Sequence, residues 1–384
     1  MDISATLSKI RITLKPKIQM FRLQSNLFLR TRIDTVTAGI GVVVQPFRKI
    51  IQQTLTLLDQ FIDFVAMHPL LDKLETSCSR MDNSIRQQTA SIRQSPAYKK
   101  AVLYAQLVRL DKPVGILLLL WPTLIALWIA AEGWPDPSVL FVFVTGVILM
   151  RSAGCAINDY ADRHVDKKVK RTKHRPLTSG KISEKETLLV FAVLSLIAFI
   201  LVLFMNALTI WMSFIGIILA ASYPFMKRYH YLPQVHLGAA FGWSAPMAYT
   251  AQANEITVVT WLIFLATILW ATAYDTMYAM VDYDDDIKIG VKSTAILFGN
   301  QDRLIIGIIQ LLLILNLILI GHRAELSGFY YLGVTAASVF AAYQQFLIKD
   351  RKRELCFQAF LNNNWLGLML FTGVFLDYQF ADLV

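Results

Sequence analysis

The sequence predicts an all-α integral membrane protein, and three observations lead to that fold class. Of the 384 residues, 55% are hydrophobic and only 17% are charged, whereas a soluble domain carries about 25% charged residues. The apolar residues gather in runs that are long enough to cross a bilayer as helices. The net charge of +10 comes from basic residues concentrated in alternate connections between these runs, which indicates membrane topology rather than a nucleic-acid partner.

Nine segments qualify as transmembrane helices, because each approaches the ~20 residues that a hydrocarbon core of about 30 Å requires. We therefore expect a bundle of about nine spans. They lie at approximately 113–131, 139–160, 186–205, 208–226, 235–252, 257–280, 303–321, 328–347 and 365–380.

Charge placement gives the expected orientation. If the chain before the first span is cytoplasmic, the second, fourth, sixth and eighth connections lie on the same side. The connections on the opposite side hold a single basic residue, Arg323. By the positive-inside rule the basic loops are therefore expected to face the cytoplasm. Their basic residues include Lys167, Lys168, Lys170, Arg171, Lys173, Arg175, Lys181, Lys227, Arg228, Lys288, Lys292, Arg303, Lys349, Arg351, Lys352 and Arg353.

The first 97 residues are expected to form a basic extension ahead of a membrane domain at 98–384. Apolar residues recur at helical spacing around 46–66, which predicts one amphipathic helix there. The opening 33 residues are rich in Arg and Lys and poor in acidic residues, which is typical of a mitochondrial transit peptide. A solvated or membrane-surface bacterial extension explains them equally well.

An asparagine and three aspartates close the second apolar segment. On a continuous helix Asn158, Asp162 and Asp166 are spaced i, i+4, i+8, and Asp159 lies three residues before Asp162, so that all four fall on one stripe. Carboxylates at a membrane boundary are costly to desolvate and usually mark function. A single acidic stretch after a helix, however, is more often a solvated cap.

A second acidic stretch closes the sixth apolar segment. Asp284 points away from the others and is the expected bystander. Two such stretches at the same side of the membrane argue against solvated caps and for one shared site. The residues that fall together on one helical face are Asp275, Tyr278, Asp282, Asp285 and Asp286.

Carboxylates on two facing stripes repel each other unless a cation binds between them. Hard oxygen ligands select Mg²⁺ or Ca²⁺, and Mg²⁺ commonly bridges a few carboxylates to a substrate phosphate. Basic residues adjoin both clusters, among them Arg175, Lys227 and Lys292. Carboxylates, metal and basic side chains together predict a diphosphate site, where positive charge stabilises a departing diphosphate.

Two other classes of protein share some of these features. A secondary transporter also places carboxylates in apolar helices, but usually near the bilayer midplane on broken helices, whereas both clusters here lie at one face. A non-catalytic lipid-binding protein could use the basic loops on anionic lipid. It would have no need for two matched carboxylate stripes.

At these residues the sequence resembles the UbiA-type membrane prenyltransferases. The first stripe matches the family pattern N-D-x-x-D-x-x-x-D, and the second matches D-x-x-Y-A-x-x-D-x-x-D-D, with Ala279 following Tyr278. The likeness covers about 100–384 and is closest to the bacterial branch that prenylates 4-hydroxybenzoate. The blocks that carry this closer likeness are 109–115, 170–177, 223–228, 238–243 and 292–299.

The resemblance implies a bundle of nine helices around a central cavity, with Mg²⁺ as cofactor. The implied leading metal ligands are Asn158, Asp162, Asp282 and Asp286, and the supporting ones are Asp159, Asp166, Asp275 and Asp285. The implied catalytic residues are Asp162, Asp282, Asp275 and Arg228. The implied substrate-binding residues are Arg171, Arg175, Lys227, Arg228, Lys292, Tyr278 and Lys112. For the carboxylate of an aromatic acid we favour Arg228 or Arg175, because carboxylates prefer bidentate arginine.

The implied activity is transfer of a polyprenyl group from polyprenyl diphosphate to the carbon ortho to the hydroxyl of 4-hydroxybenzoate, in ubiquinone biosynthesis. The alternative within the family is another acceptor, such as a naphthoate, homogentisate, haem or chlorophyllide. The expected compartment is the bacterial inner membrane, with the mitochondrial inner membrane as the alternative. Membrane lipid would surround the tail, and the N-terminal extension is expected to associate with other enzymes of quinone biosynthesis.

Overall fold

The computed structural model describes residues 94–168 and 172–380. The chain divides into one unit that ends at Lys100 and a second that begins at Ala101, and of the first unit only residues 94–100 are described. The amphipathic helix expected around 46–66 lies outside the described residues. The domain boundary expected at 97/98 stays a prediction.

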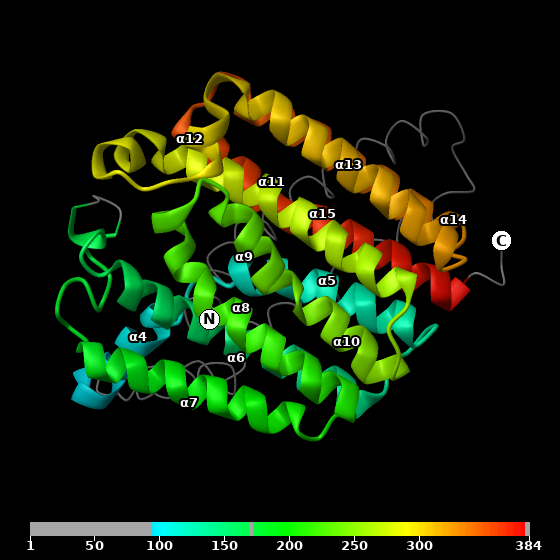
Figure 1. Ribbon diagram of the computed structural model, residues 1–384, viewed down its shortest axis with the longest axis horizontal. Helices are drawn as coiled ribbons and strands as arrows, with labels where there is room; N and C mark the ends of the chain where they lie inside the picture. Colours follow the sequence, from blue (N-terminus) through cyan, green and yellow to red (C-terminus); the bar gives the residue numbers. More distant parts are fainter. Residues whose placement is uncertain (1–93, 169–171, 381–384) are drawn as a thin grey trace, which may run out of the picture. The chain divides into compact units, whose positions relative to one another are not determined.

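All regular structure in the described part of the chain is helical, so the all-α fold class is confirmed. Within these residues, seven helical stretches are long and apolar enough to cross a membrane. The α-helices are α4 (Pro96–Leu107), α5 (Val114–Ala130), α6 (Pro137–Asp162), α7 (Glu184–Val202), α8 (Ala207–Tyr229), α9 (Pro233–Gly242), α10 (Ser244–Ala253), α11 (Val258–Ile289), α12 (Thr294–Phe298), α13 (Asp302–Arg323), α14 (Gly328–Leu347) and α15 (Arg353–Phe380), most of them labelled in Figure 1.

Two of the nine expected spans are shorter or divided. α5 has only 17 residues, and the segment expected at 235–252 consists of α9 and α10, which meet at Trp243. Pro246 explains this division, because it has no N–H to donate to the carbonyl of Gly242 and its ring crowds that carbonyl. Nine crossings therefore stay a prediction.

Two helices extend further than the apolar pattern predicts. α11 continues beyond residue 280 to Ile289, so the second aspartate cluster lies on the last turns of a 32-residue helix. α15 begins at Arg353, whereas the apolar pattern predicts a start near residue 365. The prediction starts late because three asparagines at 362–364 interrupt the apolar run. Asn363 is nevertheless buried, and it accepts a hydrogen bond from the indole N–H of Trp270 at 2.9 Å.

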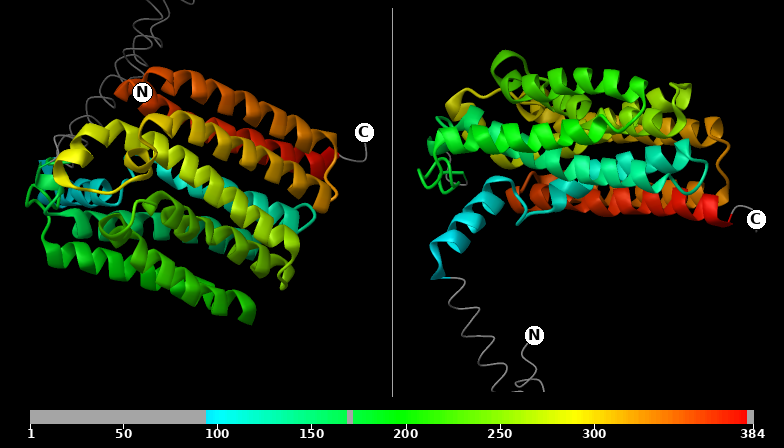
Figure 2. Two further views of the ribbon diagram at one scale, coloured as in Figure 1. Left: turned by 45° about the horizontal axis from the view of Figure 1, so that its top comes forward. Right: turned by 90° about the horizontal axis from the view of Figure 1, so that it is seen from below.

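The connections turn successive long helices back on one another. As a result α6, α8, α11 and α14 end at the side of the bundle where α5, α7, α9, α13 and α15 begin (Figures 1 and 2). We call this side the aspartate end, because α6 and α11 carry their acidic residues there. The chain order alone thus gathers the ends of four helices, and the loops that follow them, at one side.

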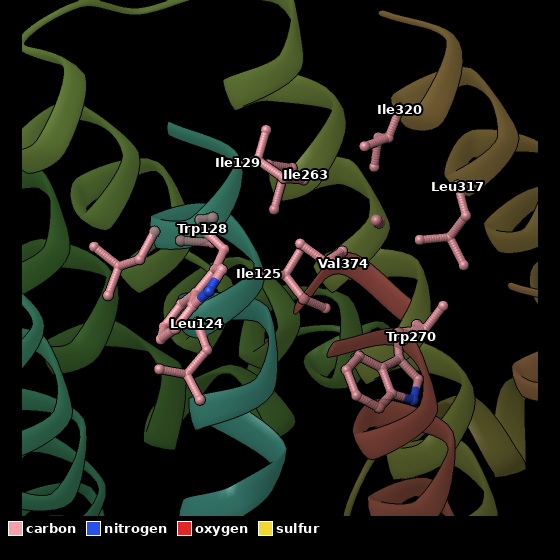
Figure 3. Packing of buried hydrophobic residues seen from close by; sticks show 14 of the residues in the cluster. Leu124, Ile125, Trp128, Ile129, Ile263, Trp270, Leu317, Ile320 and Val374 are labelled. Atoms are coloured by element: carbon pink, nitrogen blue, oxygen red, sulfur yellow. The ribbon is translucent and has the colours of Figure 1, made fainter. Parts of the chain in front are cut away.

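The core lies where α5, α11, α13 and α15 meet. α15 packs against α14, α11 and α5, and Figure 3 shows Ile125, Trp270 and Leu317 among the buried residues between these helices. Glycines allow α14 and α15 to approach closely: a Cβ on Gly373 would lie only 2.9 Å from the Cα of Gly333. Small residues at such crossings are typical of helix packing in membranes.

Apolar side chains also cover the outside of the bundle. Leu196 on α7, Trp211 on α8 and Leu311 on α13 are all more than half exposed. In helices long enough to cross a bilayer, outward-facing apolar residues are those that contact lipid. The structure and the composition therefore both indicate an integral membrane protein.

Candidate active site

The first aspartate cluster lies at the end of α6, but only part of it is on the helix. α6 ends at Asp162, and Asp166 follows in a short 3-10 turn, Asp166–Lys168. The predicted stripe through all four residues is therefore wrong at Asp166, because the helix stops one turn before it. Asn158, Asp159 and Asp162 do share the last turns of α6.

Two arginines hold the buried carboxylate of Asp159. Its Oδ1 accepts from Nη2 of Arg109 at 2.8 Å and from Nη1 of Arg175 at 3.0 Å. The same Nη1 lies 2.6 Å from Oδ2 of Asp166, so Arg175 restores the grouping that the helix end would otherwise break. Burial raises the pKa of Asp166, and the neighbouring Arg175 acts in the opposite direction.

α8 brings a lysine to the same cluster. Nζ of Lys227 donates to Oδ2 of Asp162 in an ion pair. Lys227 thus joins the end of α8 to the first aspartate cluster through Asp162.

The other predicted basic residues stand apart from the carboxylates. Arg228 donates to the carbonyl oxygen of Ala161 at 2.5 Å, at the end of α6. Lys292 donates to the carbonyl oxygen of Tyr229 at 3.0 Å. Lys112 is exposed, and Arg171 lies outside the described residues.

The second cluster is partly paired with the start of α15. Arg353 lies 3.1 Å from Asp284 and 3.5 Å from Asp285. Tyr278 packs its ring on Phe360, with 4.8 Å between the ring centroids. Asp282 and Asp286 are half-buried on the last turns of α11.

Buried oxygens in the first cluster fit a hard cation. Asp159 and Asp162 each use one carboxylate oxygen for a basic side chain, while Oδ2 of Asp159 and Oδ1 of Asp162 are buried without a hydrogen-bond partner in the described residues. A buried acceptor without a partner costs free energy, and a divalent cation would relieve it. Over residues 94–168 and 172–380, no three acidic, His or Cys side chains are grouped closely enough to hold a metal by themselves, so substrate or water oxygens would complete its shell.

Sequence reasoning missed two arginines. Arg109 is not among the predicted site residues, yet it takes a left-handed backbone conformation, φ 60°, and pairs with Asp159. Such conformations are costly for non-glycine residues and gather at functional sites. Arg151 lies within α6, and the signal for it was available, because a charged residue inside an apolar span is a functional candidate by default.

The guanidinium of Arg151 is surrounded by several helices. Nη1 lies 3.0 Å from Sγ of Cys155, and the guanidinium carbon lies 5.3 Å from the centroid of the Phe241 ring of α9. Nε is buried without a hydrogen-bond partner, and no carboxylate within the described residues forms an ion pair with this arginine.

Comparison with known proteins agrees with this fold. The chain matches the UbiA prenyltransferase family over residues 119–369. A 4-hydroxybenzoate octaprenyltransferase from Alkalilimnicola ehrlichii is 60% identical over 278 residues, which cover 72% of this chain and 95% of that relative. A 4-hydroxybenzoate octaprenyltransferase from Aeromonas hydrophila subsp. hydrophila is 59% identical over 280 residues, covering 73% of this chain and 98% of the relative.

Two solved structures share the fold. A UbiA homolog from Aeropyrum pernix K1 has a TM-score of 0.61 at 22% identity, covering 70% of this chain and 98% of its own. A UbiA homolog from Archaeoglobus fulgidus bound to GPP and Mg²⁺ has a TM-score of 0.55 at 17% identity, covering 72% of this chain and 99% of its own. With the match over residues 119–369 and relatives about 60% identical along nearly their whole length, the chain belongs to the UbiA prenyltransferase family.

Proposed function

We propose that this protein transfers a polyprenyl group from a polyprenyl diphosphate to the carbon ortho to the hydroxyl of 4-hydroxybenzoate, a step of ubiquinone biosynthesis. The observation that carries the proposal is the pairing of the buried Asp159 and Asp162 with Arg109, Arg175 and Lys227 at the aspartate end. An enzyme that expels diphosphate needs carboxylates for a metal and cations for phosphate oxygens at one place. The 60% identity to a 4-hydroxybenzoate octaprenyltransferase supports the choice of acceptor.

The diphosphate binds at the aspartate end. Asn158, Asp162, Asp282 and Asp286 would hold Mg²⁺, whose positive charge would stabilise the departing diphosphate. The relative bound to GPP and Mg²⁺ supports this use of a divalent metal. Among the residues of this chain, Lys227 donates to a carboxylate in the structure and can donate to diphosphate oxygens instead, because the exchange replaces one anionic acceptor by another.

Arg171, Lys112 and Lys292 are further proposed contacts for the diphosphate. Lys112 and Lys292 take no part in the ion pairs of the first cluster and are at least partly exposed, and Arg171 lies outside the described residues. The proposed metal ligands are supported by Asp159, Asp166 and Asp285. The ring of Tyr278, which packs on Phe360, lines the site beside them.

Arg151 is a better site for the acceptor carboxylate than Arg175 or Arg228. Arg175 is engaged by two carboxylates, and Arg228 donates to a backbone carbonyl. A guanidinium inside a membrane helix without an ion-pair partner is costly, and an aromatic carboxylate would satisfy it with two parallel hydrogen bonds. Arg151 precedes Asn158 by seven residues, or roughly 10 Å along a helix, which leaves room for one aromatic ring between the two ends of the substrate site.

The reaction then needs three events. The bond between the allylic carbon and the diphosphate oxygen breaks, the ring carbon ortho to the phenol bonds to the allylic cation, and that ring carbon loses its proton. We assign assistance of the phenol to Asp275 or Asp282, which lie two turns apart on α11. Water must be excluded because it would convert the cation to an alcohol, and the apolar bundle provides that exclusion.

The membrane setting follows from the product. A tail of many isoprene units is soluble only in lipid. It would therefore run along the helix bundle and exit laterally into the bilayer. We place the aspartate end at the cytoplasmic side of a bacterial inner membrane, with nine crossings around a central cavity, because the basic loops gather beside it. The extension at 1–97 is proposed to tether partner enzymes; deleting it and finding unchanged quinone output in cells would dismiss that role.

The test is a product balance in purified protein. Polyprenyl diphosphate and labelled 4-hydroxybenzoate should give a lipid-soluble aromatic product and diphosphate in equal amounts. Polyprenol with no aromatic product would show that the acceptor assignment is wrong and would direct the search to a naphthoate or homogentisate. Replacement of Arg151 by Met should raise the KM for 4-hydroxybenzoate and leave the KM for the diphosphate substrate unchanged.

A further inference from the structure

α5 passes Arg151 at a position that has no side chain. A Cβ on Gly115 would lie 2.6 Å from both Nε and Nη2 of Arg151 and 3.0 Å from its Cζ. The Phe241 ring lies 5.3 Å from the same guanidinium. The guanidinium therefore has its observed position only because residue 115 carries no Cβ.

The backbone itself does not require glycine at this position. Gly115 is the second residue of α5 and does not have a positive φ. Within a helix glycine is less favourable than alanine, because it loses more conformational freedom on folding. The backbone conformation therefore does not explain the glycine at residue 115. Its missing side chain leaves a space, and the side chain of Arg151 fills that space.

We infer that Gly115 is a specificity-determining position, which sets where the Arg151 guanidinium stands and hence which acidic acceptors bind. The inference rests on the proposed function, in which Arg151 holds the acceptor carboxylate. Arg151 meets Gly115 with the flexible end of its side chain, so an added methyl group moves the guanidinium rather than the helices. Restoring ordinary contact, at 3.4 Å, requires a displacement of about 0.8 Å.

A displacement of this size matters for a bidentate pair. Misplacement of a binding group by about 1 Å can cost up to 100-fold, and hydrogen bonds to charged groups are stronger than those between neutral groups. For Gly115→Ala we therefore expect binding of 4-hydroxybenzoate to weaken about tenfold. Binding of its uncharged methyl ester should change less than twofold, since the ester makes no ion pair.

The experiment measures equilibrium binding of 4-hydroxybenzoate and of the methyl ester to the purified full chain, so it does not depend on turnover. Gly146→Ala, on the same helix as Arg151, is the matched control, because its Cβ would meet nothing within 4 Å. In an Arg151→Met background, Gly115→Ala should have no further effect on either ligand.

The outcomes are distinct. Equal weakening of acid and ester by Gly115→Ala, or an additive loss in the Arg151→Met background, would show that residue 115 acts on the fold and overturn the inference. If the wild-type protein binds the acid but yields no prenylated product, the proposed reaction is wrong. The binding measurements on Gly115→Ala then still decide the inference. Wild-type protein that binds no aromatic acid would defeat both.

Discussion

Arg175 is the residue whose removal we expect to disturb the first cluster most. Its side chain is 15% exposed, and Nη1 lies 3.0 Å from Asp159 and 2.6 Å from Asp166. Asp159 keeps Arg109 as a partner, whereas Asp166 has no other ion pair among the residues that the structure describes. Arg175→Gln removes hydrogen bonds to charged groups worth about 1.5–3 kcal/mol each, but Asp166 can relax by protonation. We expect a net loss of about 3 kcal/mol in the free energy of unfolding.

A double-mutant cycle with Asp166→Asn measures this coupling. Unfolding is followed in detergent by the loss of helical circular dichroism as denaturant is added. The double variant should be little less stable than Arg175→Gln alone, with a coupling free energy of at least about 1.5 kcal/mol. Lys349→Gln is the control, because Lys349 is exposed and lies over the Phe346 ring, so this substitution should cost under about 0.5 kcal/mol. Additive losses, or a loss below about 1 kcal/mol for Arg175→Gln, would refute the reasoning.

Two further predictions concern other parts of the bundle. Lys227→Gln should raise the KM for polyprenyl diphosphate by about tenfold, because we propose that Lys227 exchanges its Asp162 partner for diphosphate oxygens; steady-state kinetics with an unchanged KM would count against that role. Gly373→Ala should destabilise the protein by about 1–3 kcal/mol, since its Cβ would meet the backbone of Gly333 at 2.9 Å and no side chain can yield. Gly146→Ala, which has open space, should be neutral or stabilising in the same unfolding assay, and equal effects of the two substitutions would contradict the close approach of α14 and α15.

Local patterns predicted much of the fold. The apolar runs located the long helices because membrane helices are apolar over about 20 residues whatever they pack against. Spacing placed Asp275 and Asp282 on one helix, and α11 indeed continues through both. The break between α9 and α10 could also have been predicted from the sequence, because Pro246 removes one backbone hydrogen bond of a continuous helix wherever it occurs.

What the sequence could not give was the pairing between distant segments. That Asp159 is shared by Arg109 and Arg175 depends on how α4, α6 and the following loop pack. The helix end at Asp162 was missed for a related reason. The sequence keeps helical spacing through Asp166, but in the structure the helix stops at Asp162 and Asp166 forms an ion pair with Arg175. The asparagines near residue 363 likewise look unfavourable in an apolar helix until Trp270 is seen to donate to one of them.

The central claim is that carboxylates from both aspartate clusters hold a divalent metal that enables diphosphate to leave. The most direct test is prenylation of radiolabelled 4-hydroxybenzoate in membranes, with Mg²⁺ or EDTA, for the wild-type chain and for Asp162→Ala and Asp282→Ala. The account predicts a lipid-soluble product that disappears with EDTA and falls by at least about 100-fold in either variant. Full activity in EDTA, or in either variant when the protein is folded, would contradict it.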